Sequence, residues 1–257
     1  MKTLPFIKMH GLGNDYIFID CFQKATEEVI AKTDLPVLAR RVSDRHFGIG
    51  SDGLVLILPS KEVDAKMRIF NADGSEAEMC GNAIRCIAKY LYESGLCTKT
   101  SMNIETLSGV RTLSLQVSNG VVHQVTVNMG VPQIEKDIFL CHTYPHAYYK
   151  VNMGNPHAVF LCDPLPLIPD NTNVEFVRVR NTKEIDVHVI ERGSGETLAC
   201  GTGACASTVA AISQGLTERM VTVHLPGGDL VVAWKADDQS VYLSGSATEV
   251  FRGELNG

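Results

Sequence analysis

Two segments far apart in the chain are near-copies of one local pattern, and this duplication restricts the fold more than any other feature. Residues 74–83 and 195–204 each contain a cysteine, Cys80 or Cys200, that is followed directly by a glycine. In each segment a glutamate precedes the cysteine by four residues, and an apolar stretch with helical periodicity follows it. A glycine closes both stretches at the same distance from the cysteine. Such a repeat predicts a fold with two related halves.

Two further pairs of segments repeat in the same order. Residues 10–19 and 151–160 both carry a Gly-Asn turn that leads into a hydrophobic strand. Residues 106–109 and 225–228 both mark a tight turn between strands. The order of Gly-Asn turn, Cys-Gly helix and hairpin therefore occurs twice, which favours duplication over chance.

The periodicity predicts helices at residues 35–42, 81–93 and 201–214 among many short strands. The third helix contains no charged residue, and an apolar helix of this length is buried in protein because it is too short to span a membrane. We therefore expect an α+β fold with two similar, pseudo-symmetric domains, each a rolled, mostly antiparallel sheet around a central helix. A cleft between the domains is expected to collect the repeated motifs and to form the active site.

Composition narrows the classes of function. The 257 residues are 45% hydrophobic and 20% charged, which is ordinary for a globular protein with a sizeable core. The formal net charge of −6 argues against a nucleic-acid binder, because phosphate groups require a basic surface. No apolar run approaches the roughly 18 residues of a membrane span, and residues 1–10 lack the apolar core of a secretory signal. We expect a cytoplasmic protein that binds neither nucleic acid nor membrane.

The eight cysteines do not form a recognisable metal or disulfide pattern. No Cys-x-x-Cys pair occurs, and neither Cys80 with Cys86 nor Cys200 with Cys205 has the spacing of a zinc knuckle. We therefore expect no metal site. Reduced cysteines, mostly buried as small apolar residues, are the default for a chain of this size.

The place of Cys80 and Cys200 directly before a helix suits acid–base chemistry. The first N–H groups of a helix have no partner within it and carry a partial positive charge, which stabilises a thiolate, a carboxylate or an oxyanion. Two such helix ends on one amino acid would hold its α-carboxylate. One thiolate would then remove the Cα proton while the opposite thiol supplies another, which inverts the stereocentre. The ordinary alternative is that each cysteine is a small core residue, and only the duplication brings paired catalysis to a comparable standing.

Six longer motifs, taken in order, carry a family resemblance. They are residues 8–16 (KMHGLGNDY), 45–53 (RHFGIGSDG), 70–76 (FNADGSE), 79–86 (MCGNAIRC), 153–157 (MGNPH) and 191–203 (ERGSGETLACGTG). With these motifs the chain resembles, over essentially its whole length, the diaminopimelate epimerases. These are cofactor-independent enzymes that interconvert LL- and meso-diaminopimelate, intermediates of lysine and peptidoglycan precursor biosynthesis.

The resemblance assigns roles to individual residues. It implies that Cys80 and Cys200 are the base and the acid and exchange these roles with the handedness of the substrate. Gly81, Asn82, Gly201 and Thr202 would grip the reacting end, and the distal amino and carboxyl groups would be read by Asn14, Asn71, Asn155, Asn173, Glu191 and Arg192. His157 is expected in a supporting role. The arginine can fork onto a carboxylate, the glutamate can pair with an ammonium, and each asparagine supplies both a donor and an acceptor.

Structural alternatives exist for these residues as well. Asn14 and Asn155 follow glycines and suit turns, Glu191 and Arg192 suit a surface ion pair, and His157 suits a packed or capping position. Gly53 departs from many relatives, which have Gln there, so a side-chain contact from this position is missing.

The resemblance also implies an organisation. It predicts one domain of residues 1–128 with 247–257 and a second of residues 129–246, together with a homodimer, an amino-acid substrate and no cofactor. Two competing functions remain. One is a racemase for proline, hydroxyproline or histidine, although Asn82 stands where the proline type tends to have His. The other is a thiol redox or binding protein that uses Cys80 and Cys200 as a reversible disulfide.

Overall fold

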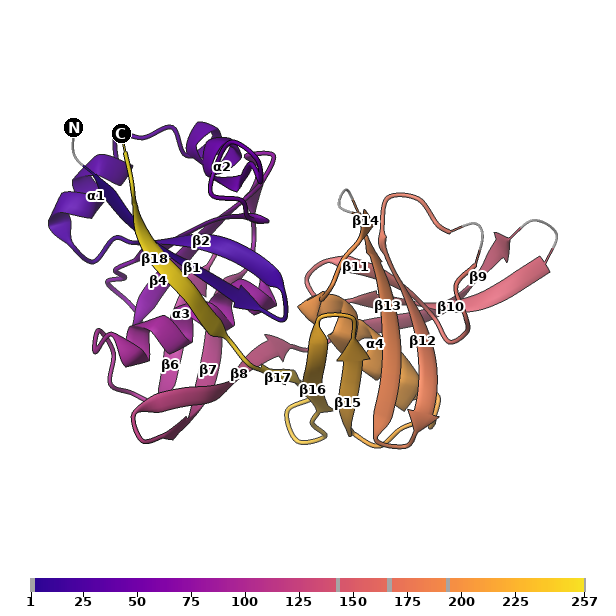
Figure 1. Ribbon diagram of the computed structural model, residues 1–257. Coiled ribbons are helices and arrows are strands. Elements are labelled where there is room, and N and C mark those ends of the chain that lie inside the picture. The colour runs from indigo at the N-terminus through magenta and orange to yellow at the C-terminus, as the bar shows by residue number, and fades with distance from the viewer. Residues whose placement is uncertain (1–2, 142–143, 166–167, 193–194, 257) are drawn as a thin grey trace. The chain divides into compact units, whose positions relative to one another are not determined.

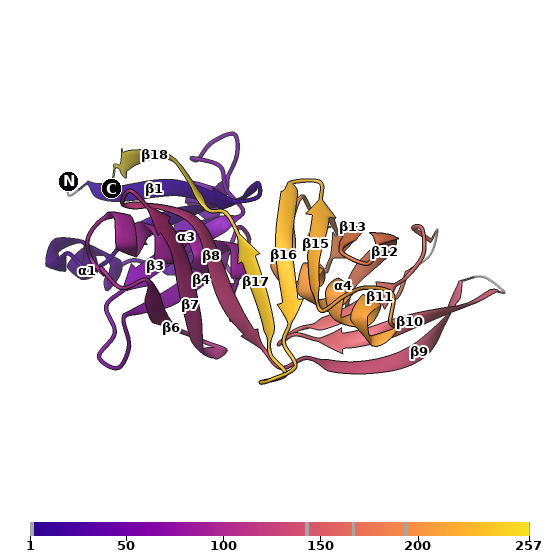
Figure 2. The same ribbon diagram turned by 90° about the horizontal axis from the view of Figure 1, so that it is seen from below.

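The computed structural model describes residues 3–141, 144–165, 168–192 and 195–256. The chain separates into two compact units, the first made of residues 1–125 and 246–257 and the second of residues 126–245. Each unit is a mixed α+β structure in which strands wrap around one long helix (Figures 1 and 2).

The first unit contains three of the helices and the termini of the chain. Its helices are α1 (Lys24–Ile30), α2 (Leu35–Ser43) and α3 (Gly81–Glu93). Its strands are β1 (Leu4–Gly11), β2 (Asn14–Asp20), β3 (Gly53–Leu58), β4 (Ala65–Asn71), β5 (Glu76–Ala77), β6 (Ser101–Thr106), β7 (Gly109–Ser118) and β18 (Thr248–Leu255), and β8 (Val121–Gly130) runs from this unit into the second.

Hydrogen bonding orders these strands as β18–β1–β2–β3–β4–β6–β7. The β2–β3 and β4–β6 pairs are parallel, and the other pairs are antiparallel. The short β5 adds to β4 directly before α3 begins. The curved sheet carries α3 on one side, where this helix packs against β1, β2 and β7.

The second unit repeats this topology. Its strands are β9 (Gln133–Cys141), β10 (Tyr144–Asn152), β11 (Pro156–Phe160), β12 (Asn173–Asn181), β13 (Glu184–Glu191), β14 (Gly195–Glu196), β15 (Met220–Leu225), β16 (Gly228–Trp234) and β17 (Val241–Gly245), with α4 (Gly201–Ser213) after β14. The order is β9–β10–β11–β12–β13–β15–β16–β17, again with two parallel pairs, β11–β12 and β13–β15.

The strand registers align the two halves residue by residue. In the first unit Tyr16 of β2 lies beside Gly53 of β3, and in the second unit His157 of β11 lies beside Asn173 of β12. Phe70 pairs with Glu76 before one cysteine, and Ile190 pairs with Glu196 before the other. The predicted α+β fold with two pseudo-symmetric halves is confirmed.

The central helices follow the sequence pattern closely. The α3 helix has the predicted bounds, and α4 ends one residue before the predicted end. Ten of the thirteen α4 residues are buried, as an uncharged helix requires. No helix among the described residues is long and apolar enough to cross a membrane.

Four elements had no counterpart in the sequence prediction: helix α1, strand β9 and the two-residue strands β5 and β14. Helix α1 is short, and its N-cap Gln23 makes no side-chain capping bond, so it lacks a start signal. Strand β9 has several exposed positions and a mixed polar pattern, so alternation does not reveal it.

Candidate active site

Both repeated cysteines are the N-cap residues of a central helix. Cys80 precedes α3 with φ −135° and ψ 120°, and Cys200 precedes α4 with φ −117° and ψ 113°. Each cysteine carbonyl accepts the first helical hydrogen bond, from Ile84 N–H at 3.0 Å and from Ala204 N–H at 2.9 Å. Each unit therefore holds one thiol at the partially positive end of its buried helix.

In the first unit Asn14 and Asn82 lie against the thiol of Cys80. The Cys80 Sγ donates to Asn14 Oδ1 at 3.5 Å, and Asn82 Nδ2 donates to the same oxygen at 3.1 Å. The fully buried Arg85 donates to Asn82 Oδ1 at 2.8 Å and to the Gly81 carbonyl at 3.0 Å. This guanidinium fixes the first turn of α3, so the side chains beside Cys80 have little freedom.

Tyr16 completes this group from β2. Its side chain is buried, and its hydroxyl contacts both Cys80 and Asn14. Burial, followed by the charge of the Cys80 thiolate and the hydrogen bond to it, raises the pKa of Tyr16 well above its usual value. Tyr16 therefore remains a neutral donor at any ordinary pH.

In the second unit a backbone N–H group and a hydroxyl lie against the sulfur of Cys200. Gly203 N–H donates to the Cys200 Sγ at 3.4 Å, and the Thr202 hydroxyl lies 3.5 Å from the same sulfur. Asn155 Nδ2 donates to the Thr202 Oγ1 at 3.3 Å, so this amide supports the hydroxyl beside the sulfur.

A buried histidine–glutamate pair lies behind Asn155. His157 Nδ1 is 2.6 Å from Glu175 Oε1, and both side chains are fully buried. His157 Nε2 is 3.0 Å from Asn155 Oδ1. A Cβ at Gly203 would lie 2.7 Å from the Glu175 carboxylate, so only glycine allows the carboxylate this close to the start of α4. Burial raises the pKa of Glu175, more than the charge and hydrogen bond of His157 lower it.

One expectation about the thiols is wrong for Cys200. A helix N-terminus alone predicts a stabilised thiolate, but burial raises the pKa of the Cys200 thiol well above its ordinary value. The negative charges of Glu191 and Glu175 raise this pKa further, against the hydrogen bonds from Thr202 and Gly203. At this cysteine desolvation and the neighbouring carboxylates outweigh the hydrogen bonds from the start of α4.

The other residues singled out from the sequence make contacts of their own. Asn71, at the end of β4, donates from Nδ2 to the Ser75 hydroxyl at 3.0 Å. Asn173 donates to the Pro156 carbonyl at 3.2 Å and accepts from Arg192 N–H at 2.9 Å. Through these contacts Asn71 and Asn173 stabilise the loops next to their strands.

Glu191 is the last residue of β13, and Arg192 follows it. Glu191 accepts from the Thr197 hydroxyl at 2.6 Å, and the Arg192 side chain is exposed. Gly81 and Gly201 are the first residues of α3 and α4. The alternative interpretation of Glu191 and Arg192 as a surface ion pair is not supported, because this pair is not among the ion pairs formed by the described residues.

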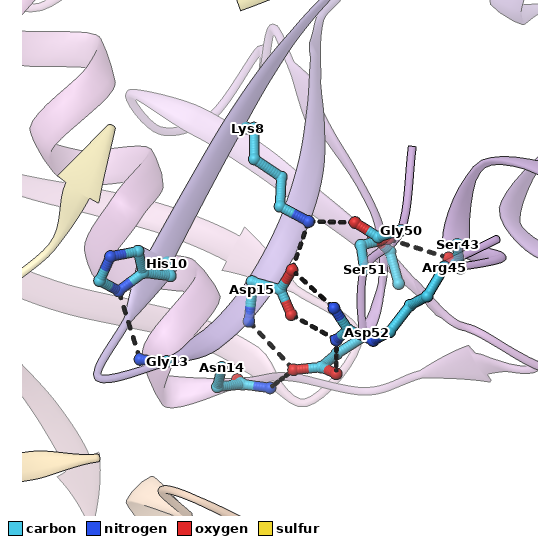
Figure 3. A network of polar contacts seen from close by, with 11 residues as sticks. Lys8, His10, Gly13, Asn14, Asp15, Ser43, Arg45, Gly50, Ser51 and Asp52 are labelled. Atoms are coloured by element: carbon cyan, nitrogen blue, oxygen red, sulfur yellow. Dashed lines mark hydrogen bonds and ion pairs between the residues drawn. The ribbon is translucent and has the colours of Figure 1, made fainter. Parts of the chain in front are cut away.

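Sequence reasoning missed a carboxylate network behind Asn14 (Figure 3). Asp52 Oδ2 accepts from Asn14 Nδ2 at 2.7 Å and from Asp15 N–H at 3.0 Å. Arg45 bridges the two carboxylates, at 2.7 Å from Asp15 Oδ1 and 2.9 Å from Asp52 Oδ1. The buried Lys8 amine contacts both Asp15 and the Gly50 carbonyl. The sequence signal for this network was present in the motif 45–53, which places an arginine and an aspartate around a glycine-rich loop.

Glu175 was missed as well. A glutamate between Val174 and Phe176 in an apolar strand is a departure from pattern that indicates a buried partner. Among the described residues, no group of three or more His, Cys, Asp and Glu side chains is arranged to hold a metal ion.

A cavity of about 500 Å³ opens in the second unit next to these residues. Its walls include His157, Pro156 and Thr172, but neither Cys200 nor Glu175. The cavity therefore adjoins the histidine without containing the thiol.

Comparison with known proteins places this geometry in a family. The family model described as diaminopimelate epimerase matches residues 6–135 and 162–250. A diaminopimelate epimerase from Pelotomaculum thermopropionicum is 48% identical over an alignment of 280 positions, which covers 98% of each chain. The chain belongs to the diaminopimelate epimerase family.

A further family member and two solved structures are similar to this chain at lower sequence identity. The diaminopimelate epimerase of Geobacillus kaustophilus is 42% identical, with all of both chains covered. Among solved structures, a phenazine biosynthesis protein of the PhzF family from Bacillus anthracis superposes with a TM-score of 0.73 at 17% identity, covering all of both chains. A hydroxyproline epimerase from Agrobacterium vitis gives 0.73 at 14% identity, covering 98% of this chain and 92% of its own. At such identities these structures show a shared fold for the diaminopimelate epimerase family and nothing about the substrate of this chain.

Proposed function

We propose that this protein is an isomerase that interconverts LL- and meso-diaminopimelate by inverting one α-carbon. The observation that carries the proposal is the duplicated thiol at the N-terminus of a buried helix, one in each half of a chain that belongs to the diaminopimelate epimerase family. Relatives named diaminopimelate epimerase and 42–48% identical over nearly their whole length support the substrate.

In the proposed reaction Cys80 and Cys200 act on opposite faces of one carbon. One thiolate takes the proton from Cα, and the electron pair of the broken C–H bond remains on the carbon as a carbanion stabilised by the carboxylate. The opposite thiol gives its proton to the other face and becomes the thiolate. The two cysteines thus exchange protonation states in each turnover, and the reverse reaction starts from the other state.

The environment of the thiols supports this chemistry. A Cα proton is a very weak acid, so the base that removes it needs a high proton affinity. Burial gives Cys200 a raised pKa, which makes its thiolate a strong base once it has formed. The N-terminal N–H groups of α3 and α4 favour the negative charge that develops on the substrate carboxylate.

Binding is proposed to use both ends of the substrate. Gly81, Asn82, Gly201 and Thr202 would hold the reacting end through backbone N–H groups and side chains at the helix starts. Arg192 would pair with the distal carboxylate and Glu191 with the distal ammonium, while Asn14, Asn71, Asn155 and Asn173 supply amide contacts. His157 would act through Asn155, to which it is hydrogen-bonded. A substrate that lacks the distal groups leaves these polar partners unpaired and is rejected.

We further propose, on family grounds, that the protein works as a cytoplasmic homodimer without a cofactor in lysine and peptidoglycan precursor biosynthesis. Light scattering coupled to size-exclusion chromatography tests the dimer, for which a mass near twice 28.0 kDa is expected.

The decisive experiment is isotope exchange in heavy water. Purified protein incubated with LL-diaminopimelate is expected to form the meso isomer with one deuterium at the inverted α-carbon. Parallel incubations with proline, hydroxyproline, histidine and glutamate test the competing racemase functions. Deuterium exchange at the α-carbon of proline but not of diaminopimelate would show that proline, and not diaminopimelate, is the substrate. Absence of exchange with every amino acid, together with a reversible disulfide between Cys80 and Cys200, would favour the thiol redox function.

A further inference from the structure

The side-chain amide of Asn14 has a hydrogen-bond acceptor at its NH₂ end and hydrogen-bond donors at its oxygen end. Its Nδ2 donates to Asp52 Oδ2 at 2.7 Å, and its Oδ1 accepts from Cys80 Sγ at 3.5 Å and from Asn82 Nδ2 at 3.1 Å. Figure 3 shows Asn14, the first residue of β2, reaching Asp52. The sulfur and the carboxylate thus contact opposite ends of one planar amide.

The Asp52 carboxylate favours one of the two orientations of the Asn14 amide. An ionised carboxylate only accepts hydrogen bonds, so it can bind the NH₂ end of Asn14 but not the oxygen end. Turning the amide over would set Asn14 Oδ1 against the Asp52 oxygen and would lose a charge-assisted bond. Asp52, together with the Asn82 amide that donates to Asn14 Oδ1, therefore favours the orientation in which Asn14 presents its oxygen to Cys80.

Asp52 is itself held in one position. Its second oxygen binds Arg45 at 2.9 Å, and the oxygen that holds Asn14 also accepts the Asp15 N–H at 3.0 Å. Burial raises the pKa of Asp15, but the hydrogen bonds and charges of Arg45 and Lys8 outweigh it and lower the pKa overall. The network thus contains two carboxylates and two cations, all with partners on fixed strands or loops.

We infer that Asp52 is a positioning residue of the active site, which acts through Asn14 to direct a hydrogen-bond acceptor at the Cys80 sulfur. An acceptor oxygen at this place stabilises the protonated S–H form of Cys80, whereas an N–H group would stabilise the thiolate. The inference rests on the proposed function, because it assigns Asp52 to the proton-transfer step in which Cys80 takes part.

The test measures the thiol directly. Asp52→Ala removes the charge-assisted bond to the Asn14 NH₂ group and leaves the bond from Asn82 Nδ2 to hold the amide. The Asn14 amide then turns its NH₂ group towards the sulfur in a larger fraction of molecules, which increases the thiolate fraction. The rate of Cys80 alkylation by iodoacetamide at neutral pH is expected to rise about threefold to tenfold, since alkylation follows the thiolate fraction and one hydrogen bond is changed. Mass spectrometry of the tryptic peptide 69–85, which contains no other cysteine, reports this rate. The kcat for diaminopimelate is expected to fall in the same variant.

A double-mutant cycle separates positioning from structural support. If Asp52 acts through Asn14, then adding Asp52→Ala to an Asn14→Ala background changes neither the alkylation rate nor kcat further. Effects that multiply in the double variant would overturn the inference. Asp52→Asn, which keeps the shape but not the accept-only chemistry, should shift alkylation in the same direction and serves if Asp52→Ala does not fold.

Asp64 provides a matched control in the same unit. Its carboxylate binds Lys99 at 2.6 Å and the Asn103 N–H at 2.8 Å, as Asp52 binds a cation and a backbone N–H, but it binds no side-chain amide among the residues that the structure describes. Asp64→Ala should lower the melting temperature by a similar amount without changing Cys80 alkylation. An equal change of alkylation in the Asp64 and Asp52 variants would show that lost stability, not amide orientation, is responsible.

Wild-type protein that fails to epimerise any amino acid rejects the proposed function, whereas an active wild type with unchanged alkylation in Asp52→Ala rejects this inference alone.

Discussion

Asn14 and Asn155 occupy equivalent places in the two halves, but their amides are turned in opposite directions. Asn14 presents its oxygen to the Cys80 thiol and its NH₂ group to Asp52. Asn155 presents its NH₂ group to the Thr202 hydroxyl beside Cys200 and its oxygen to His157. The duplicated scaffold therefore places its two sulfurs in chemically unlike surroundings, as expected if one gives a proton while the other receives it.

Replacement of either cysteine should abolish the proposed reaction. Cys80→Ala and Cys200→Ala each remove one proton carrier, and a general acid or base contributes about a hundredfold to ten-thousandfold to the rate. We expect kcat to fall by about a thousandfold or more in each variant, with unchanged circular dichroism. Cys86→Ala and Cys205→Ala are the matched controls, because these thiols are buried within the same two helices. Full activity in Cys80→Ala or Cys200→Ala would contradict the two-base mechanism.

The charge of Glu191 should suppress the reactivity of Cys200. After burial, the negative charge of Glu191 is the largest cause that raises the pKa of this thiol. Glu191→Gln removes the charge, so the pKa should fall and alkylation of Cys200 at pH 8 should become faster. The rate is read from the peptide that contains Cys200 and Cys205, with the modified sulfur assigned by fragmentation.

Glu196→Gln is the control for this experiment. Glu196 lies in the same connection between β13 and α4, but its side chain is 74% exposed, and its charge is not among the causes that shift Cys200. An equal increase of the Cys200 alkylation rate in both variants would mean that the total charge of this loop, and not the position of Glu191, controls the reactivity of the thiol.

The buried Glu175 should make folding stability depend on pH. Its pKa is raised above the ordinary value of 4.5 in the folded protein, so the folded state binds its proton more tightly than the unfolded state does. The contribution of this group is fully present below pH 4.5 and is lost as the pH rises through the folded pKa. The free energy of unfolding of wild type, relative to Glu175→Gln, should therefore decrease over that window. Urea unfolding at intervals from pH 4 to 8 measures the difference, and a difference that grows with pH would contradict the raised pKa.

In this chain Gly53 should not tolerate a side chain, although many relatives have Gln at this position. A Cβ at this position would lie 2.1 Å from the Phe70 carbonyl oxygen and 3.0 Å from the Tyr16 ring, so the backbones of β3 and β4 would have to move apart. Gly53→Ala should destabilise the protein by about 2–4 kcal/mol in urea unfolding. Gly95→Ala separates this clash from backbone strain, because its Cβ would meet nothing within 4 Å although its φ is +75°, and should cost about 1 kcal/mol. A smaller loss at Gly53 than at Gly95 would show that the strands adjust easily.

The parts of this protein that local sequence determines were predictable. Helix α3 begins after Cys80 and is closed by Gly95, and both signals lie within the segment itself. The N-cap places of both cysteines follow from the same pattern. Strand β9 was not predictable, because it is stabilised by pairing with β10 and not by an alternating pattern of its own.

The environment of the thiols was only partly predictable. Asp52 reaches Asn14 because β2 and β3 run parallel, which joins residues 38 positions apart, and no local pattern encodes that register. The raised pKa of Cys200 likewise depends on how deeply tertiary packing buries the sulfur and on Glu175, which comes from a neighbouring strand. The sequence singled out the two cysteines at the helix starts, while their electrostatics required the three-dimensional arrangement.

The pairing of Leu4 with Leu255 brings the two ends of the chain together along one edge of the first unit (Figure 1). Strand β18 there precedes β1 in space as β9 precedes β10 in the second unit. A short loop that links the present ends, with a new opening between β8 and β9, would therefore convert the protein into a linear tandem in which each half is read without interruption. In that permuted chain each half would consist of a hairpin followed by its helix-bearing sheet.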